Sequence, residues 1–449
     1  MFIEFTVSNY LSFRDEVCFS LVAGKKKSQS KVLDKDATFE LRADLKLLKC
    51  AVLYGANASG KSNLFAAVAF MRTFVLNSSK ESQSDEAIPV RPFLLQEGLT
   101  LQPSSFSITF AIEDVVYSYS FSATSTRIVS EELSSLKGKK ETTLFSRSEQ
   151  KISLSKAFAE GNLLDAKTRE NALFLSVCAN FDGKISRAIL RWFRRIHVIS
   201  GLEDMGLLPY TRQCLATDHE NHSHVQELIK SFGLGIRRFE LGEEEPTFTI
   251  PSDAPAEIRR VASAILKAEK KNGPLPRRIM SFHPMFDSSG NEVGEIGLDL
   301  AADESEGTQK LVALSGPLVD TLKSADILFI DEFDARLHPI LSHNILKQFN
   351  STTANPNNAQ LIVATHDTNM LDRDLLRRDQ IWFCEKDKYG SSHLTSLVEY
   401  KVRNDASFEK DYIMGKYGAI PMLSNNIYRI MLSDAMKEAP NSEEKHDGL

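Results

Sequence analysis

Cys50-Ala51-Val52-Leu53-Tyr54-Gly55-Ala56-Asn57-Ala58-Ser59-Gly60-Lys61-Ser62 is the stretch that decides the fold. An apolar run comes first, a loop of glycine and small residues follows, and apolar residues then recur at helical spacing over residues 64–74. Glycine leaves the backbone N–H groups able to surround a phosphate, because a side chain would keep the backbone at a distance. A strand, a glycine-rich loop and a helix in this order predict a phosphate-binding P-loop.

The residues of this loop have distinct expected roles. Lys61 supplies a positive charge to the β- and γ-phosphates, and the hydroxyl of Ser62 is expected to ligate Mg²⁺. The start of the following helix adds a partial positive charge. The residues that we expect to contact the nucleotide are Gly55, Ala56, Asn57, Ala58, Ser59, Gly60, Lys61, Ser62 and Asn63.

Composition restricts the class of protein. The 449 residues are 42% hydrophobic and 25% charged, which is ordinary for a globular protein and enough for more than one lobe. The net charge of −6 argues against a uniformly basic nucleic-acid binder. The five cysteines are scattered without a C-x-x-C pair, which disfavours a disulfide or zinc framework. Without a leader-like start or an apolar stretch of roughly 18 residues, we expect a cytoplasmic protein with no membrane partner.

Apolar periodicity predicts two kinds of sheet. Alternation over residues 2–22 predicts two short strands, and residues 106–121 predict a hairpin that turns at Glu113-Asp114. With further strand-like pieces near residues 128 and 144, these form an antiparallel sheet beside the nucleotide core. Residues 160–280 are mostly helical by pattern. Apolar runs at residues 327–330, 360–364 and 380–384 then predict buried parallel strands.

Two of these later runs end in residues that suit nucleotide chemistry. Asp331 and Glu332 follow the first run; at the carboxyl end of a parallel strand, Asp331 can hold Mg²⁺ and Glu332 can orient and deprotonate a water. His366 follows the second run and could hydrogen-bond the γ-phosphate and sense its loss. In isolation, a buried strand before a charged loop explains the first pattern equally well, and a lone histidine at a strand end is usually structural. The preceding P-loop favours the functional interpretation.

A second anion-binding pattern lies at residues 304–311, Glu-Ser-Glu-Gly-Thr-Gln-Lys-Leu. Ser305 can cap a helix, Gly307 keeps the backbone open, and the helix start attracts an anion. By itself the pattern also suits plain helix capping. Asp334 and His338 follow in the turn Asp-Ala-Arg-Leu-His-Pro, directly beyond the two acids.

The order of these motifs resembles ABC-type ATPase heads of the SMC and RecF kind. It is most similar to the bacterial AAA-family, ABC-like ATPases of Rlo/AbiL-type phage-defence loci. Residues 9–13 resemble the first strand turn of that family, and residues 304–308 resemble its signature motif. Residues 330–339 look like its Walker B and D-loop, and residues 381–387 and 415–421 look like its C-terminal motifs.

The resemblance implies an α/β fold, a P-loop NTPase of the ABC ATPase head type with an antiparallel β-subdomain and a compact helical insertion. The implied domains are residues 1–158 (first part of the head), 159–285 (mainly helical insertion), 286–425 (second part of the head) and 426–449 (C-terminal helix and tail). The implied cofactors are ATP and Mg²⁺. In such heads the signature serine meets the γ-phosphate bound by a second subunit. Carried over, Ser305 and Gly307 would complete the site across an ATP-dependent head dimer, and Thr308 and Asp334 are further implied nucleotide-binding residues.

The implied function is an ATPase sensor or scaffold in anti-phage defence that controls a separately encoded Toprim-like or RNase-like effector. This sequence departs from the ABC pattern in two places. The signature is Ser-Glu-Gly-Thr rather than Ser-Gly-Gly-Gln, and the Q-loop is unclear, with Gln96 as a weak candidate. The 245 residues between the P-loop and the signature (305 − 60) are too few for a long SMC-type arm.

Other functions stay open. A DNA-repair or chromosome-maintenance ATPase could bind nucleic acid through the basic stretch 259–278, although a solvated amphipathic helix explains that stretch as well. The signature variant and the unclear Q-loop disfavour a transporter head. Four residues crowd together and could hold a metal or form a polar loop, which we favour: Asp218, His219, His222 and His224.

Overall fold

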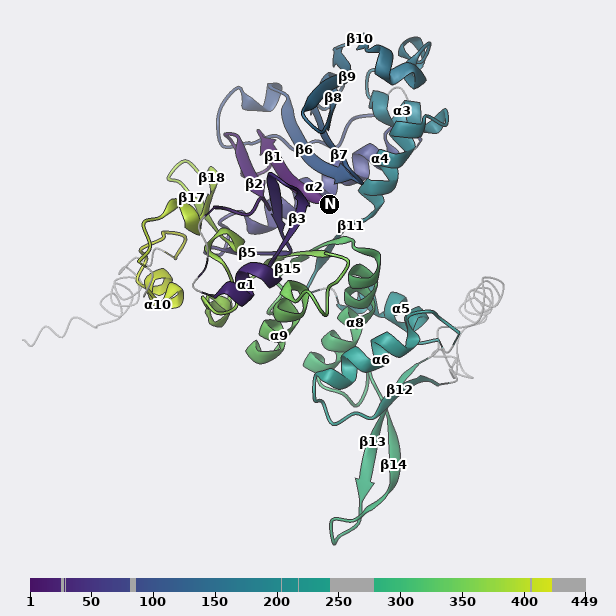
Figure 1. Ribbon diagram of the computed structural model, residues 1–449, viewed down its shortest axis with the longest axis vertical. Helices are drawn as coiled ribbons and strands as arrows, with labels where there is room; N and C mark the ends of the chain where they lie inside the picture. The colour runs from purple at the N-terminus through teal and green to yellow at the C-terminus, as the bar shows by residue number, and fades with distance from the viewer. Residues whose placement is uncertain are drawn as a thin grey trace, which may run out of the picture.

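The computed structural model describes residues 1–25, 28, 30–80, 86–202, 204–216, 218–242, 278–403 and 406–421 (Figure 1). Of the basic stretch 259–278 only Arg278 falls within these ranges, and the predicted tail 426–449 lies outside them. Two large sheets with helix α2 (Lys61–Asn77) between them hold the glycine-rich loop.

The central sheet has six strands in the order β11-β15-β16-β5-β17-β18. Their bounds are β5 (Cys50–Tyr54), β11 (Ile196–Ser200), β15 (Ile327–Asp331), β16 (Gln360–Ala364), β17 (Ile381–Lys386) and β18 (Ser392–Ser396). All neighbours pair in parallel except β17 and β18, so the carboxyl ends of the other strands meet at one edge. Every residue of β5 and β16 is buried, which confirms the predicted buried parallel strands.

The second sheet is antiparallel, with the order β10-β9-β8-β7-β6-β1-β2. Its strands are β1 (Phe2–Ser8), β2 (Val17–Ser20), β6 (Ser104–Ile112), β7 (Val115–Ala123), β8 (Ile128–Lys137), β9 (Lys140–Ser148) and β10 (Lys151–Leu154). The predicted hairpin is confirmed, because β6 and β7 pair and Glu113 takes a left-handed turn conformation with φ 53°. The predicted strands at the N-terminus and near residues 128 and 144 are confirmed as well.

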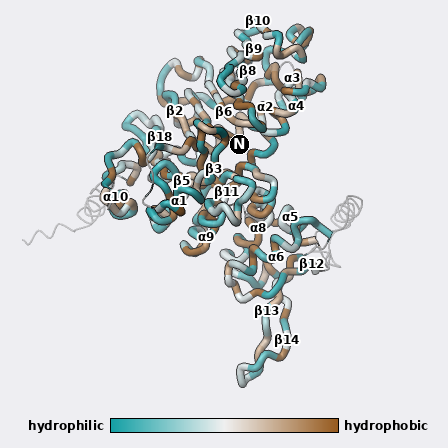
Figure 2. The backbone as a smooth tube through the Cα atoms, in the orientation of Figure 1, coloured by the Kyte–Doolittle hydropathy of each residue, from teal (hydrophilic) through white to brown (hydrophobic). Residues whose placement is uncertain are grey.

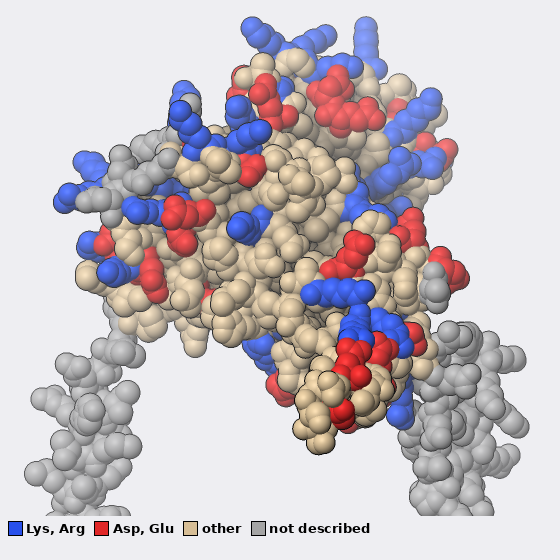
Figure 3. Space-filling view, turned by 60° about the horizontal axis from the view of Figure 1, so that its bottom comes forward, with Lys and Arg blue, Asp and Glu red and all other residues tan. Residues whose placement is uncertain are grey.

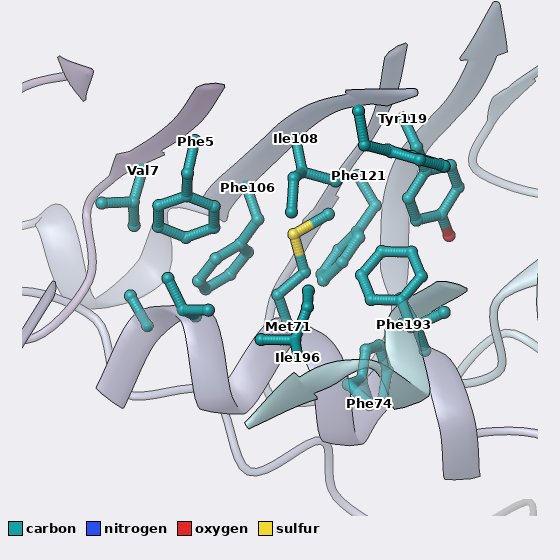
Figure 4. Packing of buried hydrophobic residues seen from close by; sticks show 14 of the residues in the cluster. Phe5, Val7, Met71, Phe74, Phe106, Ile108, Tyr119, Phe121, Phe193 and Ile196 are labelled. Carbon is teal, nitrogen blue, oxygen red and sulfur yellow. The ribbon is translucent and has the colours of Figure 1, made fainter. Parts of the chain in front are cut away.

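Helix α2 joins the two sheets into one core. Its apolar residues pack on one side against the antiparallel sheet, where the Phe74 and Phe121 rings lie 5.6 Å apart. On the other side, the rings of Phe65 and Phe329 of β15 lie 5.3 Å apart. Figure 4 shows Met71 and Phe74 facing the aromatic side chains of the antiparallel sheet. Figure 2 shows hydrophobic segments around α2 and α8 (Glu306–Ser324). The loop before α2 is therefore built on a rigid base.

Smaller elements surround this core. The remaining α-helices in the described ranges are α1 (Lys31–Asp36), α3 (Phe174–Asn180), α4 (Lys184–Arg194), α5 (Asp204–Cys214), α6 (His222–Ser231), α9 (Pro339–Asn350) and α10 (Phe408–Ile413). Short 3-10 helices are η1 (Leu99–Leu101), η2 (Lys156–Gly161), η3 (Asp165–Lys167), η4 (Thr368–Met370), η5 (Arg378–Gln380) and η6 (Leu397–Glu399). The remaining strands are β3 (Thr38–Arg42), β4 (Leu45–Leu48), β12 (Arg238–Leu241), β13 (Ile279–Phe286) and β14 (Glu292–Asp299).

The interval 159–285 contributes to the core as well as carrying helices. It holds α3 to α6, but it also supplies β11, which pairs in parallel with β15 at the edge of the central sheet. Trp192 of α4 stacks on Phe110 of β6, with ring centroids 4.0 Å apart. Residues up to 200 are thus packed into both sheets, while the domain boundaries themselves stay a prediction.

A buried ion pair fastens α3 to the antiparallel sheet. The carboxylate of Glu131 on β8 lies 3.6 Å from the Arg147 guanidinium, and both side chains are fully buried. Glu131 also accepts hydrogen bonds from the backbone N–H of Phe174 (2.7 Å) and Leu175 (2.9 Å) at the start of α3. Burial raises the pKa of Glu131, and the positive charge of Arg147 opposes that shift.

We expect Arg147→Met to lower the free energy of unfolding by about 3–5 kcal/mol, because it leaves the Glu131 carboxylate buried without its cation. Denaturant unfolding of the full chain measures this loss. The matched control is Arg127→Met, since Arg127 pairs with Glu149 at an exposed site and should contribute less than about 1 kcal/mol. Equal losses in the two variants would contradict the role of the buried pair.

Candidate functional site

A cleft of about 730 Å³ opens at the carboxyl edge of the central sheet. It is lined by Asn57, Ala58, Ser59, Gly60, Lys61, Ser62, Asn63, Leu202, Glu332, His366 and Lys386. Seven of these follow β5, and the others follow strands β11, β15, β16 and β17 or end them. The parallel arrangement thus brings together groups that are distant in the sequence, as ligand sites in such sheets require.

Two glycines of the loop are required by close packing. A Cβ on Gly55 would collide with the backbone oxygen of Cys384 on β17. Gly60 has a φ of 116°, and a Cβ there would collide with the side chain of Ser392. Both positions therefore exclude a side chain, and the loop backbone can approach a ligand closely.

Lys61 is held inside the loop. Its side chain is buried, and its Nζ donates hydrogen bonds to the backbone oxygens of Gly55 (2.8 Å) and Ala56 (3.3 Å). The same Nζ lies 3.1 Å from Nε2 of His366. Burial lowers the pKa of Lys61, and the Glu332 carboxylate opposes that shift. The geometry therefore holds one cation against two carbonyls of the loop and next to the His366 imidazole.

Glu332 and His366 face each other across the cleft. Glu332 Oε1 lies 4.0 Å from His366 Nε2, and each side chain is a little over one third exposed (35% and 37%). Glu332 has a φ of 49°, so the chain turns sharply directly after β15. Asp331 ends β15 and accepts a hydrogen bond from the Glu332 N–H at 3.1 Å, but it does not line the cleft. A distance of 4 Å between Glu332 and His366 leaves both groups able to contact a common ligand.

Asp334 lies behind His366 rather than along the cleft. Its Oδ1 accepts hydrogen bonds from the Thr365 hydroxyl (2.6 Å) and from the His366 N–H (3.2 Å). The turn after β15 therefore orients the residue that follows β16. This contact joins the predicted Walker B and histidine positions, which the sequence alone does not connect.

The second predicted group of ligand residues lies at the start of α8. Ser305 caps this helix: its Oγ accepts a hydrogen bond from the Thr308 N–H at 3.2 Å and lies 2.9 Å from Thr308 Oγ1. Neither of these residues nor Gly307 lines the cleft. Further along the helix, the buried Lys310 donates a hydrogen bond to the Phe333 carbonyl at 3.1 Å. The helix that follows the cap is thus tied to the segment that carries Glu332, and the cap lies outside the cleft that the P-loop lines.

The sequence patterns assign no individual role to three residues that line or support the cleft, although two of them lie in the family-like motifs at residues 9–13 and 381–387. Lys386 ends β17, the parallel neighbour of β5, so its place could have been inferred from the strand order. Ser12 accepts a hydrogen bond from Asn63 Nδ2 at 2.7 Å, and Ser392 Oγ donates to Ser12 Oγ at 2.7 Å. The N-terminal turn, predicted only by resemblance, therefore supports the P-loop directly. Gln96 is exposed and does not line the cleft.

Other candidate sites are explained by ordinary contacts. His222 Nδ1 lies 2.9 Å from the Leu215 carbonyl, and His219 Nδ1 accepts a hydrogen bond from the Asn221 N–H at 3.1 Å. Within the described ranges, no group of three or more His, Cys, Asp or Glu side chains is placed to hold a metal. Over those same ranges, no helix combines the length and apolarity that crossing a membrane would need.

Solved structures resemble the chain at low identity. An SMC head bound to the C-winged helix domain of ScpA is 12% identical over 88% of this chain and 97% of that chain, with a TM-score of 0.41. The SMC head domain from Thermotoga maritima is 13% identical over 88% of this chain and 98% of that chain, with a TM-score of 0.36. The structure of the recombination mediator protein RecF-ATPrS in the RecFOR pathway is 13% identical over 88% of this chain and 98% of that chain, with a TM-score of 0.28.

Sequence comparison gives a firmer result. No curated protein matches the chain. Residues 50–372, more than half of the chain, match the profile of the family described as "AAA domain, putative AbiEii toxin, Type IV TA system". The family match confirms the predicted AAA-family resemblance, and the structure confirms the predicted α/β fold, while the Rlo-type phage-defence assignment stays a prediction. With its P-loop, its parallel sheet and this match, the chain belongs to that family of AAA domains.

Proposed function

We propose that this protein binds ATP in the cleft and hydrolyses it to ADP and phosphate. The observation that carries the proposal is the meeting of three groups in one cleft: the Lys61 ammonium, the Glu332 carboxylate and the His366 imidazole. Lys61 Nζ and His366 Nε2 lie 3.1 Å apart, and Glu332 Oε1 is 4.0 Å from the same imidazole nitrogen. A cation, a base and a hydrogen-bonding sensor are what phosphoryl transfer to water requires.

Each group has a separate role in this mechanism. The β- and γ-phosphate oxygens replace the loop carbonyls as partners of Lys61, and the N–H groups of residues 56–62 surround them. Glu332 orients the attacking water and accepts its proton. His366 hydrogen-bonds the γ-phosphate and loses that contact after cleavage. The Ser62 hydroxyl and Asp331 carboxylate are oxygen donors that suit Mg²⁺, which when bound would add positive charge next to the phosphates.

We further propose that two copies complete the site. Ser305, Gly307 and Thr308 lie at the start of α8, outside the chain's own cleft. A helix start in this position can bind an anion that another subunit holds. Asp334 supports the site indirectly, because its carboxylate accepts a hydrogen bond from the backbone N–H of His366. ATP then holds two heads together, and hydrolysis releases them.

The dimer is proposed to act as a cytoplasmic sensor or scaffold that controls a separately encoded nuclease-type effector in anti-phage defence. The family description, which refers to a toxin–antitoxin system, supports a role in such a conflict system. Co-purification of the chain with the product of a neighbouring gene during phage infection tests the effector part of the proposal. Recovery of the chain without any such product would argue against it.

We expect Lys61→Ala to weaken ATP binding by about a hundredfold, because the central charge-assisted contacts to the phosphates are lost. Titration with a fluorescent ATP analogue measures the affinity. Lys80→Ala is the control, since Lys80 is an exposed lysine beyond the end of α2. Unchanged affinity in Lys61→Ala would contradict ATP binding at the loop.

The alternative function, an ATPase stimulated by nucleic acid, is favoured by one described surface. The exposed face of α4 carries four basic residues at helical spacing: Lys184, Arg187, Arg191 and Arg194. They span about 15 Å along the helix, and the opposite face is anchored by Trp192 and Phe193. Figure 3 shows Lys and Arg side chains around the upper, left-hand and right-hand edges of this face, with Asp and Glu side chains among them. A rigid row of cations complements a phosphate backbone.

If this alternative holds, neutralising the four α4 residues to glutamine should weaken binding of a DNA duplex and reduce its salt dependence. The slope of log K against log salt should fall by about 3–4, one for each lost phosphate contact. Fluorescence anisotropy at several salt concentrations measures both quantities. The control neutralises four exposed lysines elsewhere: Lys137, Lys139, Lys140 and Lys151. Equal effects in the two sets, or none, would exclude α4 as the contact surface.

A further inference from the structure

A long β-hairpin, formed by β13 and β14, projects from the body of the molecule (Figure 1). We call this hairpin the arm. Its base packs against α8: Ile279 and Leu300 belong to the same buried cluster as Val312 and Ala313 of that helix. Its far end carries exposed apolar residues, including Met285 and Phe286 (44% and 57% exposed). The arm therefore connects a distant surface with the helix that begins at the signature serine.

One carboxylate joins the arm to that serine. Glu304 directly precedes Ser305, and its side chain is only 10% exposed. Its Oε1 accepts a hydrogen bond from Ser281 Oγ at 2.6 Å and lies 2.7 Å from Nε2 of His283. Ser281 and His283 are alternate residues of β13, so they stand on the same face of the arm.

The Glu304 carboxylate belongs to the residue directly before the N-cap of α8. The first N–H groups of α8 and the positive end of its dipole attract an anion. In the proposed dimer, the anion at this position is the γ-phosphate bound by the other copy. A freely rotating Glu304 carboxylate could reach the same N–H groups and repel or replace that phosphate. Ser281 and His283 hold the carboxylate on the arm instead.

We propose that Glu304 is a positioning residue through which the arm switches the composite ATP site on and off. With the arm seated, Glu304 is held by Ser281 and His283, and the start of α8 is open to the phosphate of the partner. When the arm moves, the released carboxylate covers the helix start and blocks closure of the dimer. The proposal deepens the proposed function and rests on the head dimer that it includes.

The test separates release of the carboxylate from simple loss of structure. Ser281→Ala with His283→Ala should lower ATP-dependent dimer formation and turnover by about tenfold, because Glu304 loses its partners. Adding Glu304→Ala to this pair should restore both to within about threefold of wild type, because no competing charge remains. ATP affinity of the monomer should stay within about twofold in all variants. Glu292→Ala is the control on the same arm, since Glu292 is an exposed residue paired with Arg237.

Dimer formation is measured by sedimentation in a Glu332→Gln background, and turnover in the wild-type background. If the triple variant is as impaired as the double variant, or if the double variant behaves as wild type, the switch is refuted. If the Glu332→Gln protein itself fails to dimerise with ATP, the proposed function fails instead. The two failures are therefore distinguishable.

Discussion

Glu332→Gln is expected to lower kcat for ATP hydrolysis by about a hundredfold to a thousandfold while leaving ATP affinity within about threefold of wild type. The amide keeps the size and the hydrogen-bonding ability of the carboxylate, but it cannot accept the proton of the attacking water. The position of Glu332 supports this expectation, since its carboxylate lies in the cleft 4.0 Å from His366. Steady-state turnover and nucleotide binding measure the two quantities separately.

The same variant should accumulate as an ATP-bound dimer, because closure no longer leads to cleavage. Size-exclusion chromatography with and without ATP reports this shift. Glu385→Gln is the matched control: Glu385 is an exposed acid near the end of the neighbouring strand β17 and does not line the cleft. Normal turnover in Glu332→Gln would show that another group is the base.

Ser305→Arg is expected to reduce turnover by about a hundredfold or more without weakening ATP binding to the monomer. Ser305 is exposed and caps α8, so the arginine finds space in the isolated chain and costs about 1 kcal/mol in lost capping. In the closed dimer the same side chain would occupy the place of the γ-phosphate. The effect should therefore fall on the dimer and not on the monomer.

The control for this substitution is Ser407→Arg, because Ser407 is also an exposed serine that caps a helix, α10. It has the same capping contact, with its Oγ accepting a hydrogen bond from the Lys410 N–H at 3.3 Å. Normal turnover in Ser305→Arg, or an equal loss in both variants, would argue against a contact made across two copies.

Local patterns were sufficient for the parts of the site that are contiguous in sequence. The P-loop is predicted because strand, loop and helix follow one another. The strands before Asp331 and His366 are predicted because both are short, mainly apolar runs, and the structure shows these runs buried. The edge strand β11 was not predicted, since only Ile196 in it is buried and its sequence gives no apolar run. Its place depends on pairing with a strand more than 100 residues away.

Contacts between distant segments account for the rest. The links from Ser12 to Asn63 and Ser392, and from Asp334 to His366, arise only when several strands share one edge of the sheet. Lys386 enters the cleft for the same reason. The tie between Glu304 and the arm joins a helix start to a strand some twenty residues earlier, and no sequence motif marks it.

The central claim is that one chain supplies the P-loop and another supplies the signature serine. Mixing the Lys61→Ala and Ser305→Arg proteins tests it most directly, because each is inactive alone while a mixed dimer contains one intact site. We predict that an equimolar mixture recovers about a quarter of the wild-type ATPase rate, since half of the dimers are mixed and each has one working site of two. A mixture as inactive as the separate variants would contradict the composite site.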